Sequence, residues 1–483
     1  MRDIYLSTQT TLIITLVVGS FFIALGYINL KKISDNKSHI IGDRNEGIFS
    51  LTTSLSASAL GAWILFGPAS AATLGGIGAV VGYASGTAAP MLFLYNFGPK
   101  IRKEFPEGLS LTDYIEKRFG KEILKVSLFL ILFYLIIFLV AEVTAIAFLL
   151  KFTSKIPLWI TSAITLVICL LYVLRGGFKL SIITDKYQFS FIIIIILVTF
   201  FFIMKSTNFS SLDIIKLNTP NLIDKNYLPN YTSGLTFFIA VAATNLFHQG
   251  NWQRVFSANN DKRLKSSLII SFLMIFGIVF WMGYSGLISI SLDPTITPDL
   301  AFFNLVFKNE NKVFVAAILI LALSLTLSTI DTLINSISSL IILNGKEINK
   351  NLKGKDIKKK SNFTIILLSF FVFLFASKGY SILYLFLFAD LLCCSAVVII
   401  FFGFFKKKIN SKLAFKTIIL ALISGLLFFP SQDMTSSILV GAIFPIDMFS
   451  TFITTNLLFV SFIFPILVQS LSIFFYSFRN SFK

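Results

Sequence analysis

Charged residues are scarce in this chain of 483 residues, at 13%, whereas hydrophobic residues make up 56%. A water-soluble fold cannot bury so large a share of apolar side chains, because its surface needs polar groups. A helix that crosses a bilayer needs about 20 apolar residues. The composition therefore excludes a sizeable soluble domain and indicates an integral membrane protein with about a dozen spanning helices.

Residues that commonly build metal or redox sites are also rare. The three cysteines lie in apolar stretches, where they form neither a disulfide framework nor a CxxC pair, and the two histidines belong to no HExxH motif. A GxxxxGK[ST] phosphate loop is missing. We therefore expect neither an enzyme nor an organic cofactor, and no ATP-driven transport by this chain alone.

Thirteen apolar stretches are long enough to cross a membrane, and we predict an all-α protein with about 13 transmembrane helices. They lie at residues 11–30, 48–72, 74–98, 124–150, 157–174, 180–204, 232–250, 267–291, 313–343, 362–377, 380–405, 413–430 and 450–476. The net charge of +18 is then a matter of topology rather than of nucleic-acid binding, for which we expect no partner.

The distribution of Lys and Arg sets the orientation of these spans. With the N-terminus outside, 32 of the 41 Lys and Arg residues fall on one side of the membrane, among them the loop from Lys346 to Lys360. Cytoplasmic loops carry such an excess. We expect a multi-pass protein of the plasma or bacterial inner membrane, with its N-terminus outside and its C-terminus in the cytoplasm.

Two predicted spans contain helix-breaking residues. Gly61, Gly67 and Pro68 interrupt 48–72, and Gly250 with its polar neighbours interrupts 232–250. If the first helix is set aside, each break lies in the first helix of a five-helix half, and two halves of five helices run in opposite directions, as in inverted-repeat transporters. The expected units are an N-terminal helix with an inner loop, two repeats and two C-terminal helices, at residues 1–45, 46–204, 205–405 and 406–483.

Acidic residues inside spans cost roughly 2.5 to 3.5 kcal/mol each at the bilayer centre. Glu142, Asp331 and Asp390 are nevertheless there, and Asp185 lies near the inner end of a span. In 313–343 one helical face carries Ser324, Ser328, Asp331 and Asn335. Such an oxygen-rich stripe suits a hard monovalent cation, although lone acids and Ser stripes also serve helix packing.

Four motifs together resemble the sodium:solute symporter family, which includes proline, pantothenate, sugar, sialic acid and urea symporters. They are ASALGAWILFGPASAATLGG (57–76), GGFKLSIITDKYQ (176–188), HQGNWQR (248–254) and LSTIDTLINS (327–336). The resemblance implies the leucine-transporter-type inverted repeat of five plus five helices, with one extra helix before it and, here, two after it. It also implies a symporter that works by alternating access.

The family's main sodium site, carried over by position, implies five ligands. They are the backbone carbonyls of Ala57, Leu60 and Leu325 and the hydroxyls of Ser328 and Thr329. Asp185 matches an acid that is linked to a second cation in some members, and with Asp331 it is the expected coupling acid. Ala59 stands where some members have Asp or Asn near the sodium, and Leu325 stands where members that couple two sodium ions have a Ser of the second site, so we expect one Na⁺ per cycle.

Within the family, GAWxxxxPASAAT, YASG (83–86) and QGNWQR are most similar to the urea and polyamine transporter branch. The fold then implies a set of substrate-lining residues: Trp63, Ile64, Tyr83, Glu142, Phe247, His248, Gln249, Trp252 and Asp390. The two acids favour a solute with an amino or amidine group. The expected partners are a small polar solute such as urea, a polyamine or an amino acid, together with Na⁺ and the lipid bilayer, for a chain expected to act as a monomer.

Three other functions remain open at this point. A proton-coupled importer of the same fold would use Glu142, Asp331 or Asp390, and its uptake would follow pH rather than Na⁺. A membrane solute sensor would act through a partner. A channel is the third alternative, and the pair of interrupted helices argues against it. The sequence favours the sodium-coupled importer over each of them.

Overall fold

The computed structural model describes residues 5–29, 40–42, 44–307, 311–348, 357–405, 410–444 and 448–481. Within these ranges the secondary structure is helical, with two isolated β-bridges in place of any strand. Nine helices among the described residues are long and apolar enough to cross a membrane. Much of the basic loop from Lys346 to Lys360, and Lys31, Lys32 and Lys37 of the first inner loop, lie outside the described residues.

Helices follow one another along the described part of the chain. They are α1 (Thr8–Asn29), α3 (Ile48–Ala59), η2 (Ala62–Leu65), α4 (Gly67–Glu104), α5 (Leu111–Phe119), α6 (Lys121–Ser154), α7 (Leu158–Ser206), α8 (Ser211–Asn218), η3 (Pro220–Ile223), α9 (Leu228–Phe247), α10 (Gln249–Ser257), α11 (Asp261–Leu292), η4 (Pro298–Leu300), α12 (Ala301–Phe307), α13 (Lys312–Ile348), α14 (Ile357–Ala376), α15 (Ile382–Cys394), α16 (Val397–Phe402), α17 (Ser411–Phe428), α18 (Ile438–Ile443), α19 (Thr451–Thr455) and α20 (Leu457–Ser481).

Both predicted helix breaks are confirmed. The first separates α3 from η2 and α4, with extended backbone at Gly61. The second separates α9 from α10 at His248, whose ψ of 108° is not helical. A further turn at Gly76, where φ is +61°, divides α4 at the predicted boundary between 48–72 and 74–98. Glycine is favoured there because a side chain strains this left-handed backbone.

The structure differs from the predicted spans in two places. The stretches 157–174 and 180–204 lie in one continuous helix, α7, of 49 residues, whose two apolar parts are Leu158–Leu171 and Phe178–Ser206. The stretch 380–405 is instead interrupted, because α15 ends at Cys394 and α16 begins at Val397.

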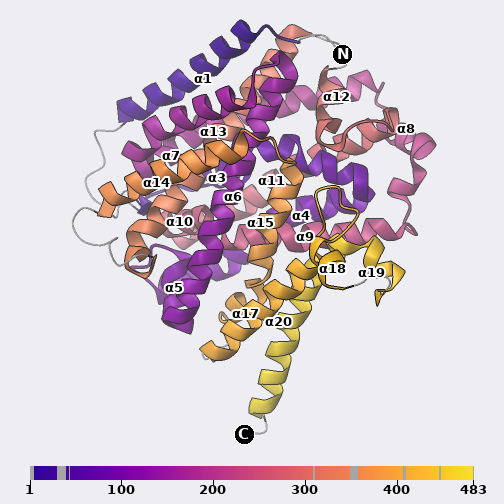
Figure 1. Ribbon diagram of the computed structural model, residues 1–483. Helices are drawn as coiled ribbons and strands as arrows, with labels where there is room; N and C mark the ends of the chain where they lie inside the picture. The colour runs from indigo at the N-terminus through magenta and orange to yellow at the C-terminus, as the bar shows by residue number, and fades with distance from the viewer. Residues whose placement is uncertain are drawn as a thin grey trace.

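The outermost helices are those with the fewest buried residues. In α1, α14 and the second part of α7, between 22% and 28% of the apolar window is buried, against 72% in α13. Figure 1 shows α1 at the upper left beside α7 and α13, and α17 packed on α20 at the opposite end of the view. Apolar side chains on such outer helices face lipid, which costs nothing in a bilayer.

Helix α4 packs tightly against α9 and α11. A Cβ on Gly78 would lie 1.7 Å from the carbonyl oxygen of Asn230, and one on Gly82 would lie 2.1 Å from that of Gly234. Small residues let helix backbones approach closely in membranes, where packing drives association. This contact holds the second part of the first broken helix against the first part of the second.

Candidate functional site

The interruption between α3 and η2 leaves backbone groups without their helical partners. The N–H of Leu60 still reaches the carbonyl of Ala57 at 3.3 Å, whereas the N–H of Ala62 donates to Oε2 of Glu142 on α6 at 2.9 Å. Oε1 of Glu142 has no hydrogen-bond partner among the described residues, and a Cβ on Gly61 would lie 2.2 Å from it. Glu142 therefore caps the break, and Gly61 makes room for it.

The interruption between α9 and α10 is closed by side chains of α10 itself. Nδ2 of Asn251 donates to the carbonyl of Asn245 at 2.9 Å, and Nε1 of Trp252 donates to that of Leu246 at 2.8 Å. The Trp252 ring also stacks on Phe401, with 6.4 Å between centroids. These contacts satisfy the last carbonyls of α9 and turn the indole toward α16.

The predicted sodium ligands are buried where α13 packs against α3 and η2. Ser328 donates its Oγ proton to Oδ1 of Asp185 at 2.8 Å, while Oγ1 of Thr329 has no hydrogen-bond partner in the described part of the chain. A hydroxyl that donates elsewhere keeps its lone pairs for a cation, and an unpartnered buried hydroxyl is costly unless something binds it. Both features suit an ion site.

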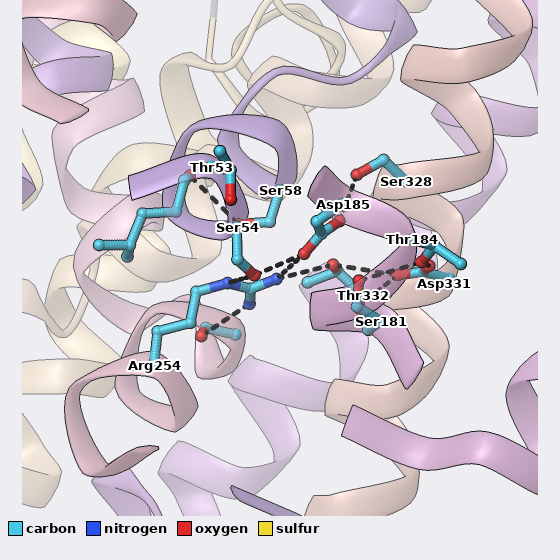
Figure 2. A network of polar contacts seen from close by, with 12 residues as sticks. Thr53, Ser54, Ser58, Ser181, Thr184, Asp185, Arg254, Ser328, Asp331 and Thr332 are labelled. Atoms are coloured by element: carbon cyan, nitrogen blue, oxygen red, sulfur yellow. Dashed lines mark hydrogen bonds and ion pairs between the residues drawn. The ribbon is translucent and has the colours of Figure 1, made fainter. Parts of the chain in front are cut away.

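A buried ion pair lies directly beside these residues, as Figure 2 shows. Arg254 of α10 donates to Oδ2 of Asp185 at 2.9 Å, to Oγ of Ser54 at 2.8 Å and to the carbonyl of Gly250 at 2.9 Å. The side chains of Arg254 and Asp185 are both 0% exposed. This pair joins α10 to α7 and, through Ser54 and Ser328, to α3 and α13.

Asp331 contacts α7, the helix that Ser328 also contacts through Asp185. Its carboxylate accepts from Oγ of Ser181 at 2.7 Å and from Oγ1 of Thr184 at 3.2 Å, both on α7. Thr332 lies between the two charged groups, 3.4 Å from Arg254 and 3.3 Å from Asp331. Asp331 thus belongs to the network of Figure 2.

A central cavity collects four of the predicted substrate residues. Trp63, Tyr83, His248 and Asp390 line it, and its volume of about 20 Å³ leaves room for about one water molecule in this conformation. The remaining lining residues are Ser58, Ala59, Phe138, Val241, Asn245, Thr329 and Phe386. Ile64, Glu142, Phe247, Gln249 and Trp252, which the sequence also suggested, are buried but are not among its lining residues.

The cavity-lining side chains that the sequence analysis missed are uncharged, and two of them are aromatic. Phe138, Phe386 and Asn245 line the cavity without belonging to any motif, and aromatic residues are too common here, at 15%, to stand out. Arg254 was part of a quoted motif, but its pairing with Asp185 needs the fold. A basic residue within HQGNWQR and an acid in TDKYQ were the available signals.

Two interrupted membrane helices meeting at a central polar cavity define a secondary transporter, in which unwound backbone binds ions and substrate. The chain belongs to the sodium:solute symporter family, which it matches over residues 39–425. It is therefore a multi-pass membrane transporter, a solute symporter with a small-molecule substrate and a coupling ion, and not an enzyme.

Individual relatives agree with this class. The chain is 26% identical over 407 residues to the spermidine transporter DUR31 of Candida albicans, covering 82% of this chain and 75% of that protein. Its fold is similar to a substrate-bound outward-open Na⁺-coupled sialic acid symporter, with a TM-score of 0.70, 16% identity and coverage of 95% and 97%.

A second solved structure has the same fold at greater distance. This is Mhp1, a nucleobase-cation-symport-1 family transporter in a closed conformation with bromovinylhydantoin bound, at a TM-score of 0.52, 14% identity and coverage of 91% and 96%. These likenesses confirm the predicted all-α, leucine-transporter-type fold.

Proposed function

We propose that this protein imports a small polar solute, such as urea, a polyamine or an amino acid, together with Na⁺. The observation that carries the proposal is the unpartnered hydroxyl of Thr329 on α13, which packs against the unwound end of α3. The ion would bind the carbonyls of Ala57, Leu60 and Leu325 and the hydroxyls of Ser328 and Thr329. Five oxygens replace the water that a hard cation gives up.

Asp185 supports this site from behind. Its Oδ1 accepts a hydrogen bond from Oγ of Ser328 at 2.8 Å. This bond orients the lone pairs of the Ser328 hydroxyl toward the ion. Arg254 neutralises most of the negative charge of Asp185, which leaves a neutral ligand set suited to a monovalent cation. We propose one Na⁺ per cycle, because Leu325 replaces a Ser that occurs in family members coupling two sodium ions.

Coupling in this proposal uses the two inverted repeats, 46–204 and 205–405. Na⁺ and solute bind at their interface, and the repeats rock to expose the site to the other side. Asp185 and Asp331 would transmit ion binding to α7, since both connect α7 to α13. One Na⁺ moving inward down 100 mV supplies about 2.3 kcal/mol, or roughly fifty-fold accumulation.

The substrate would occupy the central cavity. Trp63, Tyr83, His248 and Asp390 line it, and Ile64, Glu142, Phe247, Gln249 and Trp252 remain proposed contacts for a conformation in which the cavity is wider. We also propose a monomer in the cell membrane, with the N-terminus outside and the C-terminus inside, from the distribution of Lys and Arg.

The test is uptake into liposomes that contain the purified protein. A panel of labelled urea, polyamines and amino acids is offered with an inward Na⁺ gradient, with K⁺ in place of Na⁺, and with a pH gradient alone. Uptake that requires Na⁺ supports the proposal, and uptake that follows the pH gradient with K⁺ on both sides refutes sodium coupling in favour of the proton-coupled importer. Binding without any uptake would favour the solute sensor.

A further inference from the structure

We propose that the central cavity selects a cationic solute, one with a protonated amino, amidino or guanidino group that donates hydrogen bonds to Asp390. The inference rests on the proposed function, because it assigns the substrate class of the same cavity. The solute has one charged N–H group that binds Asp390, and Asp390 determines the specificity of the cavity. Neutral solutes of the same shape, urea among them, would then be poor substrates.

The carboxylate of Asp390 is buried without a full set of partners. Its side chain on α15 is 3% exposed, and Oδ1 has no hydrogen-bond partner among the described residues. A buried carboxylate oxygen that lacks a donor is expensive, and such groups are normally paired. A ligand that brings N–H groups would remove this cost on binding.

The walls of the cavity supply no opposite charge. Asp390 is the one carboxylate among the lining residues that the structure describes, and none of those residues is a Lys or an Arg. Arg254 is engaged with Asp185. His248 lines the cavity too, and its Nδ1 has no partner in the described ranges, so it can bind a polar group at another end of the solute. No lining residue that the structure describes supplies a positive charge to Asp390, so in this proposal the solute supplies it.

Aromatic rings enclose the same space. Trp63 stacks on Tyr83 with centroids 5.4 Å apart, Phe386 meets Trp63 edge-on at 6.3 Å, and Phe138 meets Phe386 edge-on at 4.7 Å. Ring faces attract a cation and cover the hydrocarbon next to an amine. A carboxylate within an aromatic lining matches an ammonium or guanidinium group better than a sugar or a carboxylic acid.

The nearby sodium site gives Asp390 a second role in binding a cationic solute. Thr329 belongs both to the proposed ion site and to the cavity wall, so the two ligands share a boundary. Two cations in a poorly screened interior repel each other. Asp390 offsets the charge of the solute, and with it in place Na⁺ and the solute can bind together.

The experiment measures thermal unfolding of the full-length purified protein with matched pairs of small probes. Methylguanidinium is compared with methylurea, which has the same shape without the charge, and propylammonium with propanol; agmatine, putrescine and spermidine extend the panel. Tetramethylammonium carries the charge without N–H groups. Each probe is titrated in NaCl and in KCl.

We expect the N–H cations to raise the melting temperature in NaCl and their neutral partners to have little effect. Asp390→Asn should weaken cation binding about ten- to one-hundredfold, the usual effect of a charge-assisted hydrogen bond, and should make Na⁺ and the cations compete. Asp433→Asn is the matched control, because Asp433 is exposed and bonds only to nearby Ser431 and Thr435 among the contacts in the described chain.

Three results would overturn the inference. The first is equal binding of methylguanidinium and methylurea, the second is a loss of cation binding in Asp433→Asn as large as in Asp390→Asn, and the third is that no cation in the panel binds. Tetramethylammonium binding as well as propylammonium would refute the hydrogen bond to Asp390. Stabilisation by Na⁺ in the absence of solute is read separately, so that failure of sodium binding and failure of amine selectivity are distinguished.

Discussion

Replacing Thr329 by Val tests the proposed ion site most directly, because it exchanges one unpartnered hydroxyl for a methyl group of similar size. The Thr329 side chain is 3% exposed, and its Oγ1 has no hydrogen bond to any described residue. The substitution therefore breaks no hydrogen bond among the described residues. What it removes is one of five proposed oxygen ligands for a cation that has left its water behind.

The expected effects on stability have opposite signs with and without Na⁺. Without Na⁺, Thr329→Val should melt at the same temperature as the wild type or higher, because a buried hydroxyl without a partner costs free energy. When Na⁺ is added, the melting temperature of the variant should rise much less than that of the wild type. A lost bond to a charged group is worth about 1.5 to 3 kcal/mol, so the Na⁺ concentration for half-maximal stabilisation should rise about ten- to one-hundredfold.

The assay is thermal unfolding against Na⁺ concentration, followed by uptake at saturating solute. Thr329→Ser keeps the hydroxyl and serves as the control, with Na⁺ dependence close to that of the wild type. Ser328→Ala should differ from Thr329→Val, because it also removes the bond to Asp185 and should lower stability even without Na⁺. Unchanged Na⁺ dependence in Thr329→Val would refute the site as placed.

Substitutions at four further positions probe the surrounding network. Asp331→Asn should uncouple uptake from Na⁺ while preserving solute binding, which counterflow and gradient-driven uptake distinguish; normal driven uptake would assign Asp331 to packing alone. Glu142→Gln keeps an acceptor for Ala62 and should preserve Na⁺ affinity, whereas Glu142→Leu should lose it, and equal titrations of the two would contradict the cap. Arg254→Met should lower the free energy of unfolding by about 3 to 5 kcal/mol, because it leaves Asp185 buried without its cationic partner. Adding Asp185→Leu should restore much of the lost stability in denaturant unfolding. If the two losses of stability add instead, the two residues do not act as a pair.

The breaks of the first two interrupted helices could be predicted from the sequence because glycine and proline mark them. Gly61 and Gly67 flank the unwound part of the first, and Gly250 lies two residues beyond His248 in the second. The gap between α15 and α16 carries no such residue, since it falls at Ser395 and Ala396. The backbone groups that it frees are bonded by a side chain from another helix, which a local pattern cannot reveal.

The candidate site was predictable in its composition but only partly in its geometry. A helical face could be read for Ser328 and Asp331, because spacing fixes which residues share a side. Direction could not be read, and Asp331 turns to Ser181 and Thr184 of α7. Trp252 was expected to line the substrate site, and its indole N–H binds the Leu246 carbonyl, because an interrupted helix must satisfy its own exposed carbonyls first.

Gln469 of α20 fills the gap between α15 and α16. Its Oε1 accepts from the N–H groups of Val398 at 3.0 Å and Ile399 at 3.2 Å, and its Nε2 donates to the carbonyl of Cys394 at 2.8 Å. A helix outside the two repeats thus completes the backbone of a helix inside them. Recombinant versions shortened before residue 469 would expose these three main-chain groups to hydrocarbon, so tags and fusion partners belong after α20.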